Sequence, residues 1–205
     1  MKLGVYGGTF NPIHLGHVHI LKEFIRRLGL QKVLLIPAGT PPHKAAPDLA
    51  DAEDRLSMCA LAAKEIGEAP VEASTIEIDR AGKSYTADTL GLLHGQNPDD
   101  ELYLLMGEDM FLTLHQWVRP AEICSQAILC VSPRSEDGFE RLLLQRQRLE
   151  TEFAASCKIE DIPYVSVSST EIRERVRQGK DLSQLVPPEV EAYIATHGLY
   201  REEER

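Results

Sequence analysis

The chain has 205 residues, 43% of them hydrophobic and 26% charged, which suits one globular domain with a real core. Its formal net charge of −10 argues against a broad non-specific nucleic-acid surface, although it allows a small anionic ligand held by local donors. No apolar run approaches the roughly 20 residues that span a bilayer, and the first residues lack the apolar stretch of a signal peptide, so we expect a cytoplasmic protein that does not enter a membrane.

Apolar runs and stretches of helical period alternate along the chain. In chain order, we expect a strand at 2–7, a helix at 15–28, a strand at 32–37, a helix at 52–66, a strand at 71–78, a helix at 85–93, strands at 101–106 and 127–131, a helix at 138–153, a strand at 162–167, a helix at 169–177 and a short helix that starts at the prolines 187–188. This alternation predicts an α/β fold, a Rossmann-like doubly wound parallel sheet with helices on both faces. We expect one domain over 1–205, with a small C-terminal helical portion from about residue 168.

Ligands of such sheets bind beyond the carboxyl ends of the strands. Functional residues are therefore expected in the loops after Tyr6, Ile36, Met106, Val131 and Val167. The common phosphate motifs do not explain the first loop, because no GxGxxG follows the first strand. The GKS at 82–84 is not the end of a P-loop either, since the glycine that a P-loop requires at position 77 is replaced by glutamate.

The stretch GGTFNPIHLGH, residues 7–17, has the pattern of a different kind of anion-binding turn between a strand and a helix. Gly7 and Gly8 let the backbone turn sharply at the strand end and let a ligand approach the amides closely. A helix that begins near Leu15 directs free N–H groups and its positive dipole end at the same crevice. His14 and His17 are three residues apart, so they lie on one helix face.

Two plainer interpretations of these histidines remain. They can hydrogen-bond locally at the helix start, or HxxHxH can form a metal site. A metal site is disfavoured because no carboxylate or cysteine accompanies the motif and His19 faces away.

A second anion-binding helix start is expected in SVSSTEIRERV, residues 166–176. Ser168 is a good N-cap, and a glutamate three residues later completes a capping box, which is a purely structural role. The hydroxyls of Ser169 and Thr170, the free amides and Arg173 one turn on also form a polyphosphate cradle. Two such helix starts, one from each end of the chain, would flank one nucleotide.

These two motifs carry a resemblance. The opening stretch with its HxGH resembles the signature of the nucleotidylyltransferase superfamily, and SSTEIR matches the SSTxIR motif of that superfamily. Together with PPHK at 41–44, GKSYTADTL at 82–90, GEDMFLTLHQW at 107–117 and the VPPEVEAYI…HGLY ending, the whole chain resembles the bacterial nicotinate-mononucleotide adenylyltransferases. In that family pattern a small residue usually occupies position 108, where this chain has Glu108.

The resemblance implies transfer of the adenylyl group of ATP to nicotinate mononucleotide, which gives nicotinate adenine dinucleotide and pyrophosphate in NAD biosynthesis. The expected catalytic residues are His14, His17, Lys44 and Arg173. The expected ATP-binding residues are Gly7, Gly8, Thr9, Phe10, His17, Gly107, Asp109, Arg134, Ser168, Ser169, Thr170 and Arg173. The expected mononucleotide-binding residues are Asn11, Lys44, Ser84, Tyr85, Thr86 and Trp117. Mg²⁺ is expected to be held mainly by the ATP phosphates, with no metal ligand from the protein.

Several of these residues also have plain structural interpretations. Lys44 is a solvated surface lysine on base rates alone. Asp109, which could accept hydrogen bonds from a ribose hydroxyl, could equally be an ordinary helix N-cap. Trp117, the single tryptophan and a candidate platform for a pyridine ring, could be a core or interface residue. Tyr85 and Thr86 stand at an expected helix start, where backbone amides can hold a carboxylate.

Two other functions stay open. Phosphopantetheine adenylyltransferase shares the first and last motifs, but it is shorter and lacks the SYTxDTL stretch. A non-catalytic nucleotide-binding module of the same fold would bind ATP without releasing pyrophosphate. The sequence leaves the oligomeric state open, a homo-oligomer included.

Overall fold

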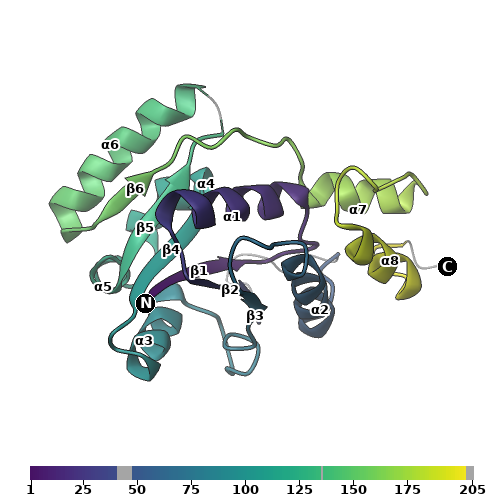
Figure 1. The fold of residues 1–205 in the computed structure, drawn as a ribbon, viewed down its shortest axis with the longest axis horizontal. Coiled ribbons are helices and arrows are strands. Elements are labelled where there is room, and N and C mark those ends of the chain that lie inside the picture. The colour runs from purple at the N-terminus through teal and green to yellow at the C-terminus, as the bar shows by residue number, and fades with distance from the viewer. Residues whose placement is uncertain (41–47, 135, 202–205) are drawn as a thin grey trace.

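A computed structural model describes residues 1–40, 48–134 and 136–201. Within these residues, six strands form one parallel sheet in the order β3-β2-β1-β4-β5-β6 (Figure 1). The strands are β1 (Lys2–Gly8), β2 (Lys32–Pro37), β3 (Val71–Ala73), β4 (Glu101–Gly107), β5 (Ala127–Ser132) and β6 (Cys157–Ile159). The order reverses between β1 and β4, as in a doubly wound sheet, so the predicted fold class is confirmed.

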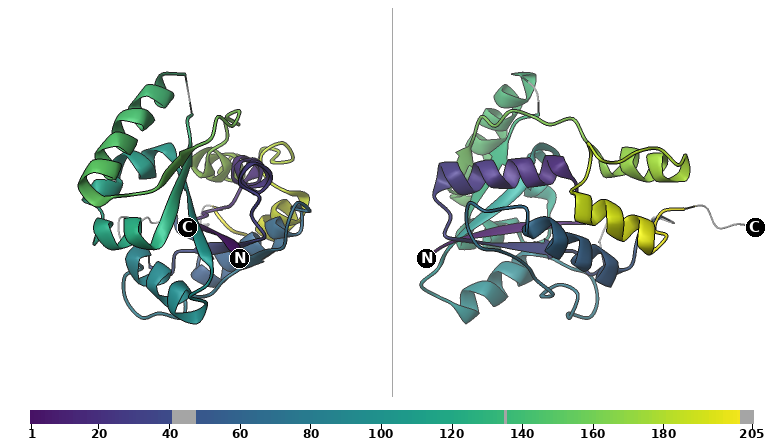
Figure 2. Two further views of the ribbon diagram at one scale, coloured as in Figure 1. Left: turned by 60° about the vertical axis from the view of Figure 1, so that its left-hand side comes forward. Right: turned by 45° about the vertical axis from the view of Figure 1, so that its right-hand side comes forward.

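Helices cover both faces of the sheet (Figure 2). One core cluster joins the sheet to α1, α2, α7 and α8, and the other joins it to α3, α4, α5 and α6. The helices are α1 (Leu15–Leu28), α2 (Ala52–Ala63), α3 (Thr86–Gln96), α4 (Glu108–Thr113), α5 (Pro120–Gln126), α6 (Glu136–Phe153), α7 (Ser169–Arg177) and α8 (Pro188–Thr196), with a 3₁₀ turn at Leu114–Gln116. None of the helices that the structure describes combines the length and apolar character needed to cross a membrane.

The helix α1 follows directly from its sequence. Its apolar residues recur at helical spacing, and all five of those that face the sheet are buried: Val18, Leu21, Phe24, Ile25 and Leu28. The helix ends at Gly29, which adopts the left-handed conformation (φ 65°) and donates its N–H to the carbonyl of Ile25. Both ends lie where the sequence predicts them, and the first residue of α1 therefore follows directly on His14.

The expected strand at 162–167 is wrong, and the sixth strand is instead Cys157–Ile159, which pairs with Leu129–Val131 of β5. The N–H of Ile162 donates to the side-chain hydroxyl of Ser132 (3.2 Å) and to the Glu160 carbonyl (3.0 Å), neither of which is a ladder bond, and Pro163 has no N–H to donate. The segment leaves the sheet and crosses to α1, where the Pro163 carbonyl contacts Nε2 of His19 (2.9 Å). This crossing brings the start of α7 beside the start of α1 (Figure 1).

Other boundaries differ from expectation. The strand predicted at 71–78 ends at Ala73, and the helix predicted at 52–66 ends at Ala63. Two short helices, α4 and α5, were not expected, because each is too brief to show a helical period of apolar residues.

Phe24 is fully buried between α1 and the sheet, so we predict that Phe24→Ala lowers the free energy of unfolding by about 3 to 5 kcal/mol. Leu144 on α6 is 70% exposed, and Leu144→Ala should change stability by no more than about 0.5 kcal/mol. Urea unfolding followed by circular dichroism measures both values. Equal losses for the two variants would contradict this account of the core.

Candidate active site

The junction between β1 and α1 holds two stacked histidines. His14 is the N-cap of α1, and its ring stacks on that of His17 with centroids 3.6 Å apart and planes 26° apart. The backbone N–H of His14 donates to Nδ1 of His17 (3.3 Å). A neutral His17 that accepts at Nδ1 carries its proton on Nε2, so this second nitrogen is a donor.

Aromatic and glycine residues fix this pair. The ring of His17 meets the edges of Tyr6 and Phe10, with centroids 6.2 Å and 5.2 Å away. A Cβ on Gly8 would lie 2.9 Å from the Phe10 ring, and a Cβ on Gly16 would lie 3.1 Å from the His14 ring. The Gly of HxGH thus allows the ring of the first histidine to pack closely against the first turn of α1.

Gly7 differs from these two glycines. A Cβ added there would meet no atom within 4 Å, so the end of β1 faces open space. Phe10 follows with a left-handed backbone (φ 48°), which a non-glycine residue adopts only when its surroundings impose it. The side chain of Phe10 is buried, whereas Thr9 is half-buried in the same turn. A ligand can therefore approach the backbone of this turn at Gly7.

Both imidazoles are neutral at physiological pH. Burial, and after it the nearby charge of Arg134, lower the pKa of His14 to about 4. The pKa of His17 lies well below its usual value, first because of burial and then because of His14 and Arg134. Nδ1 of His14 is buried and has no hydrogen-bond partner among the described residues. The pair therefore offers polar nitrogens without carrying charge.

The start of α7 lies against the opening loop, as predicted. Ser168 caps α7 by accepting the N–H of Glu171 (3.1 Å), while the Glu171 side chain pairs with Arg175 and does not close the expected capping box. The Ser169 hydroxyl donates to the carbonyl of Pro12 (2.9 Å). The two helix starts are thus joined by a direct hydrogen bond.

Three residues predicted to bind the substrates, Asn11, Thr170 and Arg173, bond to other residues of the protein in this structure. Arg173 donates from Nη1 to the carbonyl of Asn11 (2.8 Å), and its Nη2 lies at hydrogen-bond limit from the hydroxyl of the exposed Thr170 (3.5 Å). The Asn11 side chain donates to the Asp48 carbonyl (2.8 Å) and accepts from the Tyr200 hydroxyl (2.9 Å). The roles of Asn11, Thr170 and Arg173 toward substrates stay predictions.

A further set of predicted site residues connects the end of β4 to the end of β5. Gly107 is the N-cap of α4, and the exposed carboxylate of Asp109 pairs with Nη1 of Arg134 (2.6 Å). Glu108, the departure from the family pattern, is buried; it accepts the backbone N–H of Arg134 (2.7 Å) and a bond from Arg141 (2.6 Å). Because the charge of Arg134 acts on His14 and His17, this group belongs to the same site as the histidines.

The residues predicted to bind the mononucleotide lie around the start of α3. Tyr85 is the N-cap of α3 and Thr86 its first residue, while Ser84 is buried and donates its N–H to the Thr40 carbonyl (3.4 Å). Trp117 is half-buried, packs on the second core cluster and donates a long bond to the Thr113 hydroxyl (3.4 Å). An ion pair between Asp88 and Arg119 ties the segment after Trp117 to α3. Lys44 lies outside the described residues, so its role stays a prediction.

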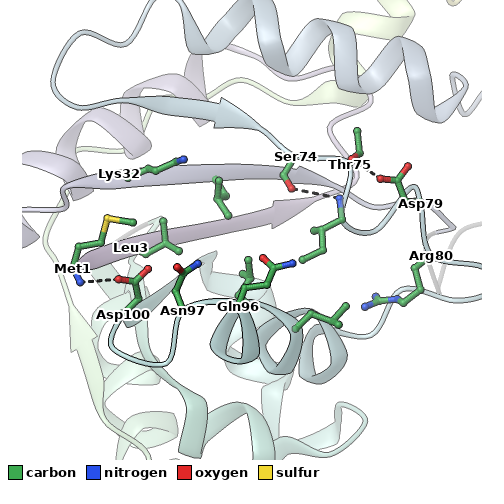
Figure 3. Close-up of a pocket in the computed structure, with 14 residues that line it drawn as sticks. Met1, Leu3, Lys32, Ser74, Thr75, Asp79, Arg80, Gln96, Asn97 and Asp100 are labelled. Atoms are coloured by element: carbon green, nitrogen blue, oxygen red, sulfur yellow. Dashed lines mark hydrogen bonds and ion pairs between the residues drawn. The ribbon is translucent and has the colours of Figure 1, made fainter.

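A separate cavity of about 580 Å³ lies between α3 and the face of the sheet near β2 and β3 (Figure 3). Leu3, Ser74, Arg80, Gln96 and Asp100 are among its lining residues, and no predicted site residue is. The candidate site is therefore defined by the chemistry at the strand ends and not by this cavity. As for metals, no group of three or more His, Cys, Asp and Glu residues suited to hold an ion occurs within 1–40, 48–134 and 136–201.

Two buried charged residues were absent from the predicted site. Glu108 holds the Arg134 segment, and Arg55 of α2 bonds to three backbone carbonyls. For Arg55 the sequence did carry a signal, since it lies three and four residues before Met58 and Cys59, which form the buried face of α2.

Comparison with known proteins identifies the family. A cytidylyltransferase-like family model matches residues 5–175. A "probable nicotinate-nucleotide adenylyltransferase" of Clostridium tetani is 36% identical over 98% of this chain and 99% of its own length, and one of Trichlorobacter lovleyi is 40% identical over 98% and 100%. The chain belongs to the nicotinate-nucleotide adenylyltransferases, within the cytidylyltransferase-like family.

The fold of this adenylyltransferase family is also seen in a solved structure. The Plasmodium falciparum nicotinic acid mononucleotide adenylyltransferase complexed with NaAD superimposes with a TM-score of 0.76, over 97% of each chain, at 17% identity. At that identity the likeness concerns the fold alone. The relatives match the chain nearly end to end, whereas the family model ends at Arg175 and leaves α8 outside.

The depressed pKa of His14 makes stability depend on pH. In the unfolded chain this imidazole takes up a proton near pH 6.5, but in the folded protein only near pH 4, so the free energy of unfolding falls as the pH drops through this window. His14→Gln removes this contribution, which is on the order of 3 kcal/mol below pH 4. We expect urea unfolding between pH 7 and 4 to show a smaller loss of stability for the variant than for wild type.

His94→Gln is the matched control, because it replaces an exposed imidazole on α3 and leaves the stacked pair intact. If His14→Gln and wild type lost stability in parallel, His14 would not be held neutral by its surroundings.

Proposed function

We propose that this protein transfers the adenylyl group of ATP to nicotinate mononucleotide, giving nicotinate adenine dinucleotide and pyrophosphate in the cytoplasm. The observation that carries the proposal is the stacked pair His14 and His17 at the start of α1, directly beyond the open end of β1. A helix start with free amides and two uncharged polar rings suits a polyphosphate. The family assignment supplies the acceptor.

The chemistry requires no nucleophile from the protein. The phosphate of the mononucleotide is already an anion and attacks the α-phosphorus of ATP, while pyrophosphate leaves on the opposite side. Catalysis then consists of holding the two phosphates in line and stabilising the charge that develops on the transferred and leaving groups. We assign Nε2–H of His17 as such a donor, and as a neutral ring it need not give up a proton during the step.

The charges around the triphosphate come from the second helix start and from the strand ends. Arg134, at the end of β5, acts electrostatically on both histidines, and we assign it to the same triphosphate. We assign Ser168, Ser169 and Arg173 at the start of α7 to the same phosphates. Asp109 is assigned to a ribose hydroxyl, which would compete with its present ion pair to Arg134.

We assign Mg²⁺ to the phosphates of the bound nucleotide; within the described residues no group of three or more His, Cys, Asp and Glu is suited to hold an ion. Bound to the ATP phosphates, it would neutralise part of their negative charge. The protein's own residues then hold the phosphates and not the ion.

For the acceptor we assign the start of α3. The backbone amides that follow the N-cap Tyr85 can hold the carboxylate of nicotinate, and Trp117 offers a ring for the pyridine. Phosphopantetheine would need neither feature, and a non-catalytic module would release no pyrophosphate. Incubation with ATP, Mg²⁺ and each acceptor in turn, with pyrophosphate measured, separates these three functions.

Acceptor choice gives a first functional prediction. Nicotinate mononucleotide should show a higher kcat/KM than its amide, by about tenfold or more, because the amide leaves donors at the start of α3 without a charged partner. Steady-state assays with both acceptors at saturating ATP measure this ratio. Equal use of both acceptors would remove the basis for placing the carboxylate at Tyr85 and Thr86.

A second functional prediction concerns His17. His17→Ala should lower kcat about a hundredfold or more, the scale of removing one donor to a developing charge, while the KM for ATP changes much less. His19→Ala on the same helix is the matched control, because His19 faces Pro163 and not the stacked pair. A His17→Ala enzyme with full turnover and only a lower melting temperature would make the histidines structural.

A further inference from the structure

Arg55 of α2 is a buried cation with no assigned role. Its side chain is 1% exposed, and no ion pair links it to a carboxylate anywhere in the described parts of the chain. Its guanidinium donates instead to three backbone carbonyls: Nη1 to Thr9 (2.9 Å), Nη2 to Gly39 (3.2 Å) and Nε to Ala50 (3.0 Å). One rigid planar group thus joins three separate segments.

Two of these segments are the continuations of neighbouring strands. β1 and β2 are paired as far as Gly8 and Pro37, and the last bond between them runs from the N–H of Ala38 to the carbonyl of Gly8 (2.9 Å). Beyond this bond the chains diverge, and the carbonyls of Thr9 and Gly39 no longer have a strand partner. Arg55 fills the gap between them and so fixes how far the two loops separate.

The third carbonyl connects Arg55 to the rest of the site. Ala50 accepts from Arg55 at its carbonyl and donates its N–H to Asn11 (3.0 Å), which lies three residues before His14. On the other side, Gly39 is so close to the next segment that a Cβ would lie 2.3 Å from the Glu77 carbonyl. The contacts of Arg55 therefore extend toward both the histidines and the segment that leads to Tyr85.

A core role alone does not account for an arginine here. An apolar side chain of similar volume would fill the space without burying a charge. It would, however, leave three partly buried carbonyls without their donors, and all three belong to the loops of the site and not to the core. Arginine is the side chain that satisfies three carbonyls at fixed mutual angles.

We propose that Arg55 is a positioning residue that sets the separation of the loops after β1 and β2, and with it the alignment of the two substrates. The inference rests on the proposed adenylyl transfer, because it is the loop after β1 that presents His14 and His17 to the nucleotide. A lysine keeps the charge at this position but cannot bond all three carbonyls at once.

The test compares Arg55→Lys with Met58→Ala, a neighbour on the same buried face of α2 that bonds to none of the loops. Both variants should be less stable than wild type. Assayed at a temperature where each is fully folded, Arg55→Lys should lose about 30-fold or more in kcat, since a misplacement of about 1 Å can cost a hundredfold. Met58→Ala should keep kcat within about threefold.

Hydrogen exchange in the absence of substrate gives a readout that does not depend on activity. The amides of Ala38 and Ala50, whose bonds flank Arg55, should exchange faster in Arg55→Lys than in a Met58→Ala protein of matched global stability. If wild type transfers no adenylyl group, the proposed function fails while the exchange rates still decide whether Arg55 orders the loops. Matched exchange rates, or a kcat loss no greater than that of Met58→Ala, would overturn the proposal. So would the failure of Arg55→Lys to fold at any temperature, which would make Arg55 a folding residue.

Discussion

The stacking of His14 on His17 is the contact on which the rest of the site depends. Two imidazoles 3.6 Å apart would repel each other if both were protonated, and burial in this junction keeps both neutral at physiological pH. The contact also requires α1 to begin at Leu15, because His14 must be its N-cap for its N–H to reach His17. The short glycine-containing turn after β1 and the glycine at position 16 are consequences of that geometry.

The reversal of strand order between β1 and β4 explains why distant residues reach this pair. The chain leaves β1 toward α1 on one face and leaves β4 toward α4 on the other, and ligands of such sheets bind at this reversal of strand order. Arg134, from the end of the next strand, acts electrostatically on the histidines from the other side of the reversal. Glu108, where this chain departs from the family pattern, accepts the backbone N–H of Arg134 and so has a structural role in holding that residue.

The sequence correctly predicted the features that depend on the spacing of residues close together in the chain. The limits of α1, the start of α7 at Ser169 and the paired histidines all follow from residues within one or two helical turns of each other. The prediction was wrong where an element depends on pairing with a segment that is distant in the sequence. β6 is three residues long and pairs with a single neighbour, β5, whereas 162–167 is more apolar but lies outside the sheet. Arg55 escaped notice because its partners are carbonyls, which every residue possesses.

The hydroxyl of Tyr200 bonds to the side chain of Asn11, across 189 positions of sequence. Asn11 also accepts a hydrogen bond from Ala50 and, through its carbonyl, one from Arg173, so three widely separated stretches of chain converge on this one turn. Contacts of such long range form only after the entropy of closing large loops has been overcome. The sheet around β1 can assemble from nearer neighbours, but the turn that presents the histidines acquires its final shape late in folding, when the end of the chain has docked against its beginning.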